Sequence, residues 1–247
     1  MKALILAAGR GSRMRHMTQD RPKGLTPLRG KPLVARQCEA LRAAGATEIG
    51  IVTGYRAESL APYADRTFHN DRWAETQMVQ SMAMAAEWLS QAPLIVSYSD
   101  IFYEPETVGA LAEAEADLAI SYDPDWETQW SGRFEDPLDD AETFRLAPGR
   151  GGRSVLREIG RRPRSLAEVE GQYMGLLRFT PSGWNAAQQV HRALSPEDRD
   201  SLTMTALLDL LVGRRMEIQA IPSVGPWGEI DSVEDLTFFE SNAPMTV

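Results

Sequence analysis

The sequence predicts an α/β fold with a mainly parallel, mixed sheet flanked by helices. In the first half, short apolar runs alternate with amphipathic segments, the pattern typical of βαβ units. A glycine-rich turn follows the first apolar run, Lys2–Ala7, as in open sheets that bind ligands beyond the carboxyl ends of their strands. The second half is less regular. We therefore expect a single domain over residues 1–247 that contains an insertion at about 123–170.

Strands and helices are expected to alternate before the insertion. Pro32 opens an amphipathic stretch and Gly45 closes it, which indicates a helix between them. Each apolar run that follows is four to six residues long and suits a buried strand. The predicted elements are strand 2–7, helix 32–44, strand 48–53, helix 58–63, helix 76–90, strand 93–97, helix 105–114 and strand 118–122.

The insertion has a different composition from its surroundings. Trp126, Trp130, several acidic residues and the glycine cluster 149–152 interrupt the regular alternation and indicate hairpins or loops. Regular patterns then resume. They predict strand 172–179, helices 183–193 and 203–212, and a late strand 217–221.

Composition narrows the class of protein. Hydrophobic residues make up 43% and charged residues 25%, as in ordinary globular domains. The formal net charge of -9 would repel a polyanion, which disfavours nucleic acid as a partner. No apolar run is long enough for a membrane span or a signal-peptide core, so we expect a cytoplasmic protein with no membrane partner. A homodimer is compatible with the sequence. Cys38 is the single cysteine and rules out an internal disulfide.

The turn after the first strand is suited to phosphate. Gly9 and Gly11 allow backbone N–H groups to approach phosphate oxygens, and Arg13 and Lys23 supply positive charge. The sequence argues against a Walker loop, because no Gly-Lys-Ser/Thr follows the glycines. It also argues against a dinucleotide-binding turn, because Met14 stands where a third small residue is required. The expected nucleotide contacts in this turn are Leu6, Ala7, Ala8, Gly9, Gly11, Ser12 and Arg13.

This stretch resembles the signature of the sugar-nucleotide pyrophosphorylase superfamily, Ala-Ala-Gly-x-Gly-x-Arg followed by Pro-Lys. Segments 69–81, 126–130 and 228–235 further resemble bacterial phosphocholine cytidylyltransferases and their phosphonate-activating relatives. The resemblance implies a Rossmann-like fold of the nucleotide-diphospho-sugar transferase type. It also implies CTP as the nucleotide and a small phosphorylated or phosphonate acceptor. The signature positions are filled by Ala7, Ala8, Gly9, Gly11, Arg13, Pro22 and Lys23.

Asp100 and Asp231 are the candidate ligands of a magnesium ion. Asp100 follows the strand 93–97, at the sheet edge where the nucleotide is expected. Mg²⁺ commonly takes one or two carboxylates together with substrate phosphate oxygens. Each aspartate has a structural alternative as a helix N-cap, since Asp231 precedes Glu234 at capping-box spacing and Asp100 precedes a predicted helix. The resemblance implies the metal role for both.

The expected chemistry requires no protein nucleophile. A phosphomonoester already carries a nucleophilic oxyanion at neutral pH, so catalysis reduces to positioning and charge neutralisation. Lys23 is then expected to steady phosphoryl oxygens at the reacting centre, and Arg13 to hold the departing pyrophosphate. The non-catalytic alternative, a nucleotide-binding regulatory protein, would not need this complete set of charged residues.

The base and the acceptor are less clearly indicated. By resemblance, the segment from Gln77 to Ser81 faces the base, although many relatives have Asn at the position of Gln77. The tryptophans and acidic side chains of the insertion could enclose an ammonium group, or could simply be core. A sugar-1-phosphate nucleotidyltransferase using UTP, dTTP or GTP is the alternative enzyme. The candidate acceptor contacts are Trp130, Arg133, Asp140, Glu142, Glu170 and Gln172.

Overall fold

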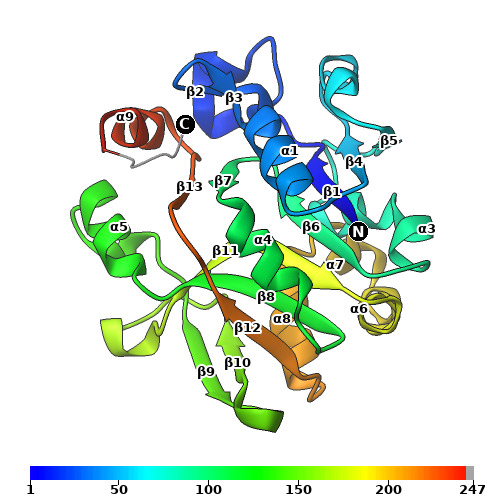
Figure 1. Ribbon diagram of the computed structural model, residues 1–247, viewed down its shortest axis with the longest axis vertical. Coiled ribbons are helices and arrows are strands. Elements are labelled where there is room, and N and C mark those ends of the chain that lie inside the picture. Colours follow the sequence, from blue (N-terminus) through cyan, green and yellow to red (C-terminus); the bar gives the residue numbers. More distant parts are fainter. Residues whose placement is uncertain (243–247) are drawn as a thin grey trace.

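The predicted α/β class is confirmed by the computed structural model, which describes residues 1–242 (Figure 1). Within these residues the main sheet has nine strands in the order β5-β4-β1-β6-β11-β8-β12-β10-β9. The strands of this sheet are β1 Lys2–Ala7, β4 Glu48–Thr53, β5 Arg66–His69, β6 Leu94–Tyr98, β8 Leu118–Asp123, β9 Phe144–Pro148, β10 Ser154–Ile159, β11 Gln172–Phe179 and β12 Ile218–Pro222.

The sheet is mixed, with a parallel half built from the first part of the chain. Strands β5, β4, β1 and β6 are parallel, whereas β11 runs antiparallel between β6 and β8. Two small sheets lie at the carboxyl ends of the parallel strands (Figure 1). They consist of β2 Pro27–Leu28 with β3 Lys31–Pro32, and β7 Ile101–Tyr103 with β13 Trp227–Glu229.

Helices cover both faces of the sheet. Along β1, Leu4 and Leu6 enter the core on one face, while Ala3, Ile5 and Ala7 enter the core on the other. This double burial explains why the strand is apolar throughout rather than alternating. The helices are α1 Leu33–Ala43, α2 Met78–Ala83, α3 Ala86–Leu89, α4 Pro105–Ala112, α5 Trp126–Arg133, α6 Pro181–Ala193, α7 Pro196–Asp200, α8 Met204–Gly213 and α9 Val233–Asn242.

Two sequence predictions of local structure are wrong. The helix expected over 58–63 is a pair of short 3-10 turns, η3 Ala57–Ser59 and η4 Ala61–Tyr63. The helix expected over 76–90 is divided because Ala85 leaves the helical region at φ -97° and ψ 23°. The insertion 123–170 contains a hairpin, as expected, formed by β9 and β10 at the edge of the main sheet, and also a helix that was not expected, α5.

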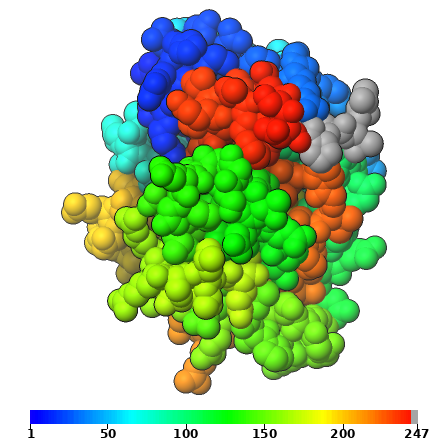
Figure 2. All heavy atoms as spheres, turned by 90° about the vertical axis from the view of Figure 1, so that its left-hand side faces the viewer, coloured from blue at the N-terminus to red at the C-terminus, as the bar shows by residue number. Residues whose placement is uncertain are grey.

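A third, smaller core joins the two ends of the described chain. Met14 and Leu33 from the N-terminal region pack with Ile230, Leu236 and Phe239 from the C-terminal region. Helix α9 therefore lies beside β2 and the 3-10 helix η1, Ser12–Thr18 (Figures 1 and 2). This packing places the segment before α9 next to the turn after β1. Within residues 1–242, every helix is too short or too polar to cross a bilayer.

Candidate active site

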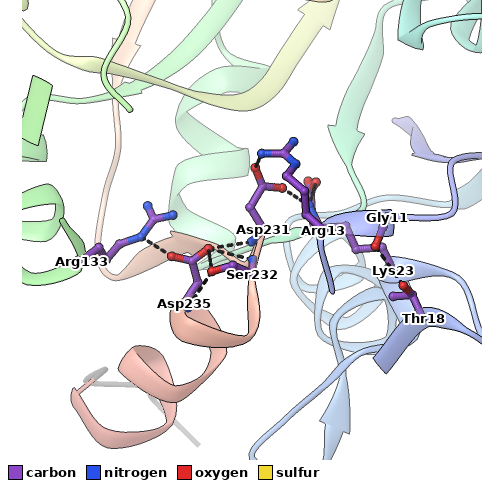
Figure 3. Close-up of polar contacts among 9 residues, drawn as sticks. Gly11, Arg13, Thr18, Lys23, Arg133, Asp231, Ser232 and Asp235 are labelled. Carbon is purple, nitrogen blue, oxygen red and sulfur yellow. Dashed lines mark hydrogen bonds and ion pairs between the residues drawn. The ribbon is translucent and has the colours of Figure 1, made fainter. Parts of the chain in front are cut away.

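The turn after β1 is held in shape by Gly11. Its φ of 72° lies in the left-handed region, and a Cβ at this position would lie 2.6 Å from Lys23 Cβ. The carbonyl of Gly11 accepts hydrogen bonds from Met14 N at 3.0 Å and Thr18 Oγ1 at 2.9 Å (Figure 3). Gly9 is exposed, with no atom within 4 Å of where its Cβ would lie. The turn thus packs Lys23 beneath Gly11 and leaves the Gly9 backbone open.

Lys23 is a buried cation between two acidic side chains. It is 8% exposed; its Nζ lies 2.6 Å from Asp100 Oδ2 and is also paired with Asp231 Oδ1. Burial disfavours the ammonium, but the charges of Asp100 and Asp231 outweigh that effect and raise the pKa of Lys23. Lys23 therefore stays protonated at neutral pH and can offer a fixed positive charge.

Asp100, Glu229 and Asp231 form a cluster of carboxylates. One oxygen from each lies within 4.8 Å of the others. They meet because β7 and β13 pair antiparallel, with Glu229 opposite Ile101, and because Ile230 N donates to the carbonyl of Asp100 at 2.9 Å. Glu229 was missed in the sequence analysis. The sequence signal for Glu229 is its position two residues before Asp231, because alternate residues of an extended segment point to the same side.

The electrostatics of the cluster favour a bound cation. Burial and the charges of Asp100 and Asp231 raise the pKa of Glu229. Burial opposes ionisation of Asp231, but Lys23 and then Arg13 outweigh it and lower the pKa of that carboxyl. Arg13 Nη1 lies 2.5 Å from Asp231 Oδ2. Among the described residues, the buried Asp100 Oδ1 has no hydrogen-bond partner. Oxygen ligands of this kind, including one without a partner, fit Mg²⁺.

The helix-cap alternative for the two aspartates is not supported. Helix α9 is capped by Ser232 and Asp235: Ser232 Oγ accepts from Asp235 N at 3.1 Å, and Asp235 Oδ2 accepts from Ser232 N at 2.9 Å. This is a reciprocal capping box one residue later than the predicted pair of Asp231 and Glu234. Helix α4 is preceded by Glu104, not by Asp100. Asp100 and Asp231 are therefore not helix caps, and both carboxylates face Lys23 in the cluster.

A cavity of about 360 Å³ opens next to the carboxylates. Its lining includes Arg13, Glu229 and Asp231, together with residues of α2, α5, β6, β9, β10, β11 and α8 and of the loops between them. With other residues of 1–242, neither the Asp140 nor the Glu142 carboxylate forms a hydrogen bond or an ion pair. Of the predicted residues, the cavity is lined by Arg13, Gln77, Trp130, Asp140, Glu142, Gln172 and Asp231.

One of the two tryptophans that could enclose an ammonium group lines the cavity. Trp130 is largely buried, packs against Trp227 with ring centroids 6.1 Å apart, and reaches the cavity. Trp126 points elsewhere, since its indole N–H donates to the Val169 carbonyl at 3.2 Å. Gln172 donates to the Glu142 carbonyl at 2.9 Å and so supports the segment just before β9, which carries this carboxylate. Burial, and then the charge of Asp140, raise the pKa of Glu142.

Several predicted contacts lie outside the cavity lining. Arg133 is buried in an ion pair with Asp235 at 2.8 Å, which takes the guanidinium away from the expected place of an acceptor phosphate. Glu170 is exposed and accepts from Leu146 N at 2.6 Å. Ser81 is buried and accepts from Asn70 Nδ2 at 3.0 Å. In the turn, Leu6, Ala7 and Ala8 are buried, whereas Ser12 is exposed beside Arg13.

Comparison with known proteins identifies the family of this chain. A family model described as a MobA-like NTP transferase domain matches residues 3–174. The CTP:phosphoglutamine cytidylyltransferase of Campylobacter jejuni is 33% identical over 255 residues, covering 96% of this chain and 98% of that protein. The choline-phosphate cytidylyltransferase of Streptococcus pneumoniae is 36% identical over 106 residues, covering 41% of this chain and 46% of that protein.

Solved structures share the fold at lower identity. The inositol-1-phosphate CTP transferase of T. maritima is 19% identical, with a TM-score of 0.74 and coverage of 97% of this chain and 94% of that one. The predicted resemblance to the pyrophosphorylase superfamily and to bacterial cytidylyltransferases is confirmed by these relatives. The chain thus belongs to the family of MobA-like NTP transferase domains and is an enzyme of the nucleotidyltransferase type.

Proposed function

We propose that this enzyme is a magnesium-dependent cytidylyltransferase that couples CMP to a small phosphorylated or phosphonate acceptor carrying an ammonium group. The observation that carries the proposal is the cluster of Asp100, Glu229 and Asp231 around Lys23, beside a cavity lined by Asp140 and Glu142, whose carboxylates form no ion pair with any other described residue. Similarity over 96% of this chain to a CTP:phosphoglutamine cytidylyltransferase supports CTP as the nucleotide.

The transfer itself is a displacement at phosphorus. An oxygen of the acceptor attacks the α-phosphorus of CTP and forms a new P–O bond, while the bond from that phosphorus to the bridging oxygen breaks and its electrons leave with pyrophosphate. Lys23 lies where a fixed ammonium can stabilise charge on the phosphoryl oxygens, and the exposed Arg13 can hold the pyrophosphate. Mg²⁺, held by Asp100 and Asp231 with Glu229 beside them, would neutralise phosphate charge.

The rest of the cavity suits the proposed substrates. The open backbone at Gly9 and the Gln77 side chain on the cavity wall are proposed to contact the nucleotide, with Ser81 supporting this wall from inside. Asp140 and Glu142 are proposed to receive the ammonium group, and Trp130 to cover its apolar part. Arg133 and Glu170 are no longer proposed as direct acceptor contacts, because their partners lie elsewhere. Cytoplasmic location and a homodimer stay predictions.

A matrix of pyrophosphate release tests this function. CTP, UTP, dTTP, ATP and GTP would each be offered with phosphoglutamine, phosphocholine, phosphoethanolamine, 2-aminoethylphosphonate and glucose 1-phosphate, in the presence of Mg²⁺. We expect turnover with CTP and an acceptor that carries an amino or ammonium group. Turnover confined to UTP, dTTP or GTP with the sugar phosphate would instead identify a sugar-1-phosphate nucleotidyltransferase.

A further inference from the structure

Arg133 connects helix α5 to the first turn of helix α9. Its Nε donates to Asp235 Oδ1 at 2.8 Å, and the two side chains are only 2% and 7% exposed (Figure 3). Helix α5 belongs to the insertion, whereas Asp235 lies in the first turn of α9. The ion pair therefore joins two parts of the chain that are about a hundred residues apart.

The second oxygen of Asp235 organises the backbone that carries Asp231. Asp235 Oδ2 accepts hydrogen bonds from Asp231 N at 3.0 Å, Ser232 N at 2.9 Å and Ser232 Oγ at 2.8 Å (Figure 3). A carboxylate that accepts three hydrogen bonds and one guanidinium contact has little freedom to rotate. The peptide N–H of a proposed metal ligand is thus held by a side chain that does not itself reach the cavity.

Arg133 also contacts a wall of the cavity. Its guanidinium lies 4.9 Å from the ring centroid of Trp130, which lines the cavity, and 5.0 Å from that of Phe134. Among the described residues, its buried Nη1 has no hydrogen-bond partner. A planar guanidinium can stack on an aromatic ring while one edge pairs with a carboxylate, and a lysine cannot do both.

The geometry points to Arg133 and Asp235 as positioning residues that set the conformation of Asp231 for the metal ion. Arg133 fixes Asp235, and Asp235 fixes the backbone of Asp231 before any ligand binds. Because Arg133 also packs on Trp130, it supports both Asp231, the proposed metal ligand, and Trp130, the proposed acceptor contact. This inference rests on the metal site of the proposed function. It extends that function by naming residues that act from outside the reacting centre.

Binding of Mn²⁺ alone, without nucleotide or acceptor, tests this inference. The dissociation constant would be measured by the loss of the electron paramagnetic resonance signal of free Mn²⁺, and unfolding of each variant by circular dichroism. The decisive variant is the double substitution Arg133→Met with Asp235→Leu, which removes the buried ion pair without leaving one buried charge alone. Because Asp235 also accepts three hydrogen bonds at the start of α9, we expect a lowered melting temperature. In the folded variant the affinity for Mn²⁺ should be at least about tenfold weaker, the effect typical of losing a residue that holds a metal ligand in place.

Two further variants complete the comparison. Arg133→Lys keeps the charge but loses the planar guanidinium that stacks on Trp130 and pairs with Asp235 at once. The affinity of this variant for Mn²⁺ should lie between those of the wild type and the double variant. Arg162→Met removes an exposed arginine of the same insertion, paired with Asp139 at 3.5 Å, and should leave Mn²⁺ binding unchanged. Wild-type affinity in both the double variant and Arg133→Lys would overturn the inference and leave the proposed function standing. Failure of the wild-type protein to bind Mn²⁺ would overturn the metal site, and the inference with it.

Discussion

Lys23 Nζ lies 2.6 Å from Asp100 Oδ2, although the two residues are 77 positions apart in the sequence. Lys23 starts a 3-10 turn, η2 Lys23–Leu25, and Asp100 lies between β6 and β7. Their contact brings the charge expected to bind phosphate next to the side chain expected to bind metal. The predictions below follow from this arrangement and from the cavity beside it.

Replacing Lys23 by Met should reduce kcat for pyrophosphate release by at least about a hundredfold, because a preorganised charge at the reacting centre is lost. The matched control is Lys31→Met, since Lys31 is an exposed lysine paired with Glu39 outside the site. Steady-state rates of both variants, with circular dichroism to check folding, make the comparison. Near-normal turnover of a folded Lys23→Met protein would contradict the proposed role.

Removal of the metal should abolish activity. We expect EDTA to stop pyrophosphate release and added Mg²⁺ to restore it. Since losing one outer-shell partner typically weakens metal binding by about 10–100-fold, Asp100→Asn should raise the half-saturating Mg²⁺ concentration by at least about a hundredfold. Asp139→Asn, an exposed acidic side chain paired with Arg162, is the control. An unchanged Mg²⁺ requirement in Asp100→Asn would remove this residue from the metal site.

Glu142 and Glu170 form a natural test pair for acceptor binding. Glu142 lines the cavity, whereas Glu170 accepts a backbone hydrogen bond outside it. With an acceptor that carries an ammonium group, Glu142→Gln should raise the acceptor KM by about tenfold or more, the effect of losing a charged hydrogen bond. Its KM for CTP should change little, and Glu170→Gln should leave both values near wild type. Equal changes in the two variants would show that Glu142 does not contact the acceptor.

The two glycines of the turn should respond differently to alanine. Gly11→Ala adds a Cβ 2.6 Å from Lys23 Cβ at a residue with positive φ, so the free energy of unfolding should fall by about 1–3 kcal/mol. Gly9→Ala meets no atom within 4 Å and should leave stability within about 0.5 kcal/mol. If phosphate approaches the Gly9 backbone, the same substitution should still raise the KM for CTP several-fold. Denaturant titrations and kinetics with CTP separate the two effects.

Cys38 should be slow to react with thiol reagents. Burial raises the pKa of this thiol to about 11, and its Sγ lies 3.5 Å from the Tyr63 carbonyl. The raised pKa means that the reactive thiolate is scarce below pH 11 and increases about tenfold with each pH unit approaching that value. Alkylation by iodoacetamide at pH 8 should therefore be far slower in the native protein than in guanidinium chloride. Equal rates would show that Cys38 is neither buried nor perturbed.

The most reliable sequence predictions were those that depend on neighbours along the chain. The first strand and the glycine turn lie within the first 25 positions, and the structure has both, with Gly11 at positive φ. Runs such as 48–53 and 118–122 were assigned correctly because strands buried on both faces are apolar throughout. The helix expected over 76–90 was not, because its break at Ala85 has no glycine or proline to mark it.

The amino-acid sequence by itself determined the α/β class and the glycine turn after the first strand, because these follow from local pattern and motif. The roles of Lys23, Asp100 and Asp231 toward phosphate and metal stay predictions. Only the tertiary structure decided which distant side chains share the site. Pairing of β7 with β13 brought Glu229 to Asp100, and packing of α9 on the N-terminal region brought Asp231 to Lys23. Packing of α5 against α9 paired Arg133 with Asp235 and kept it out of the cavity lining. Contacts of this kind arise when separate elements bury a common core, and no local spacing encodes them.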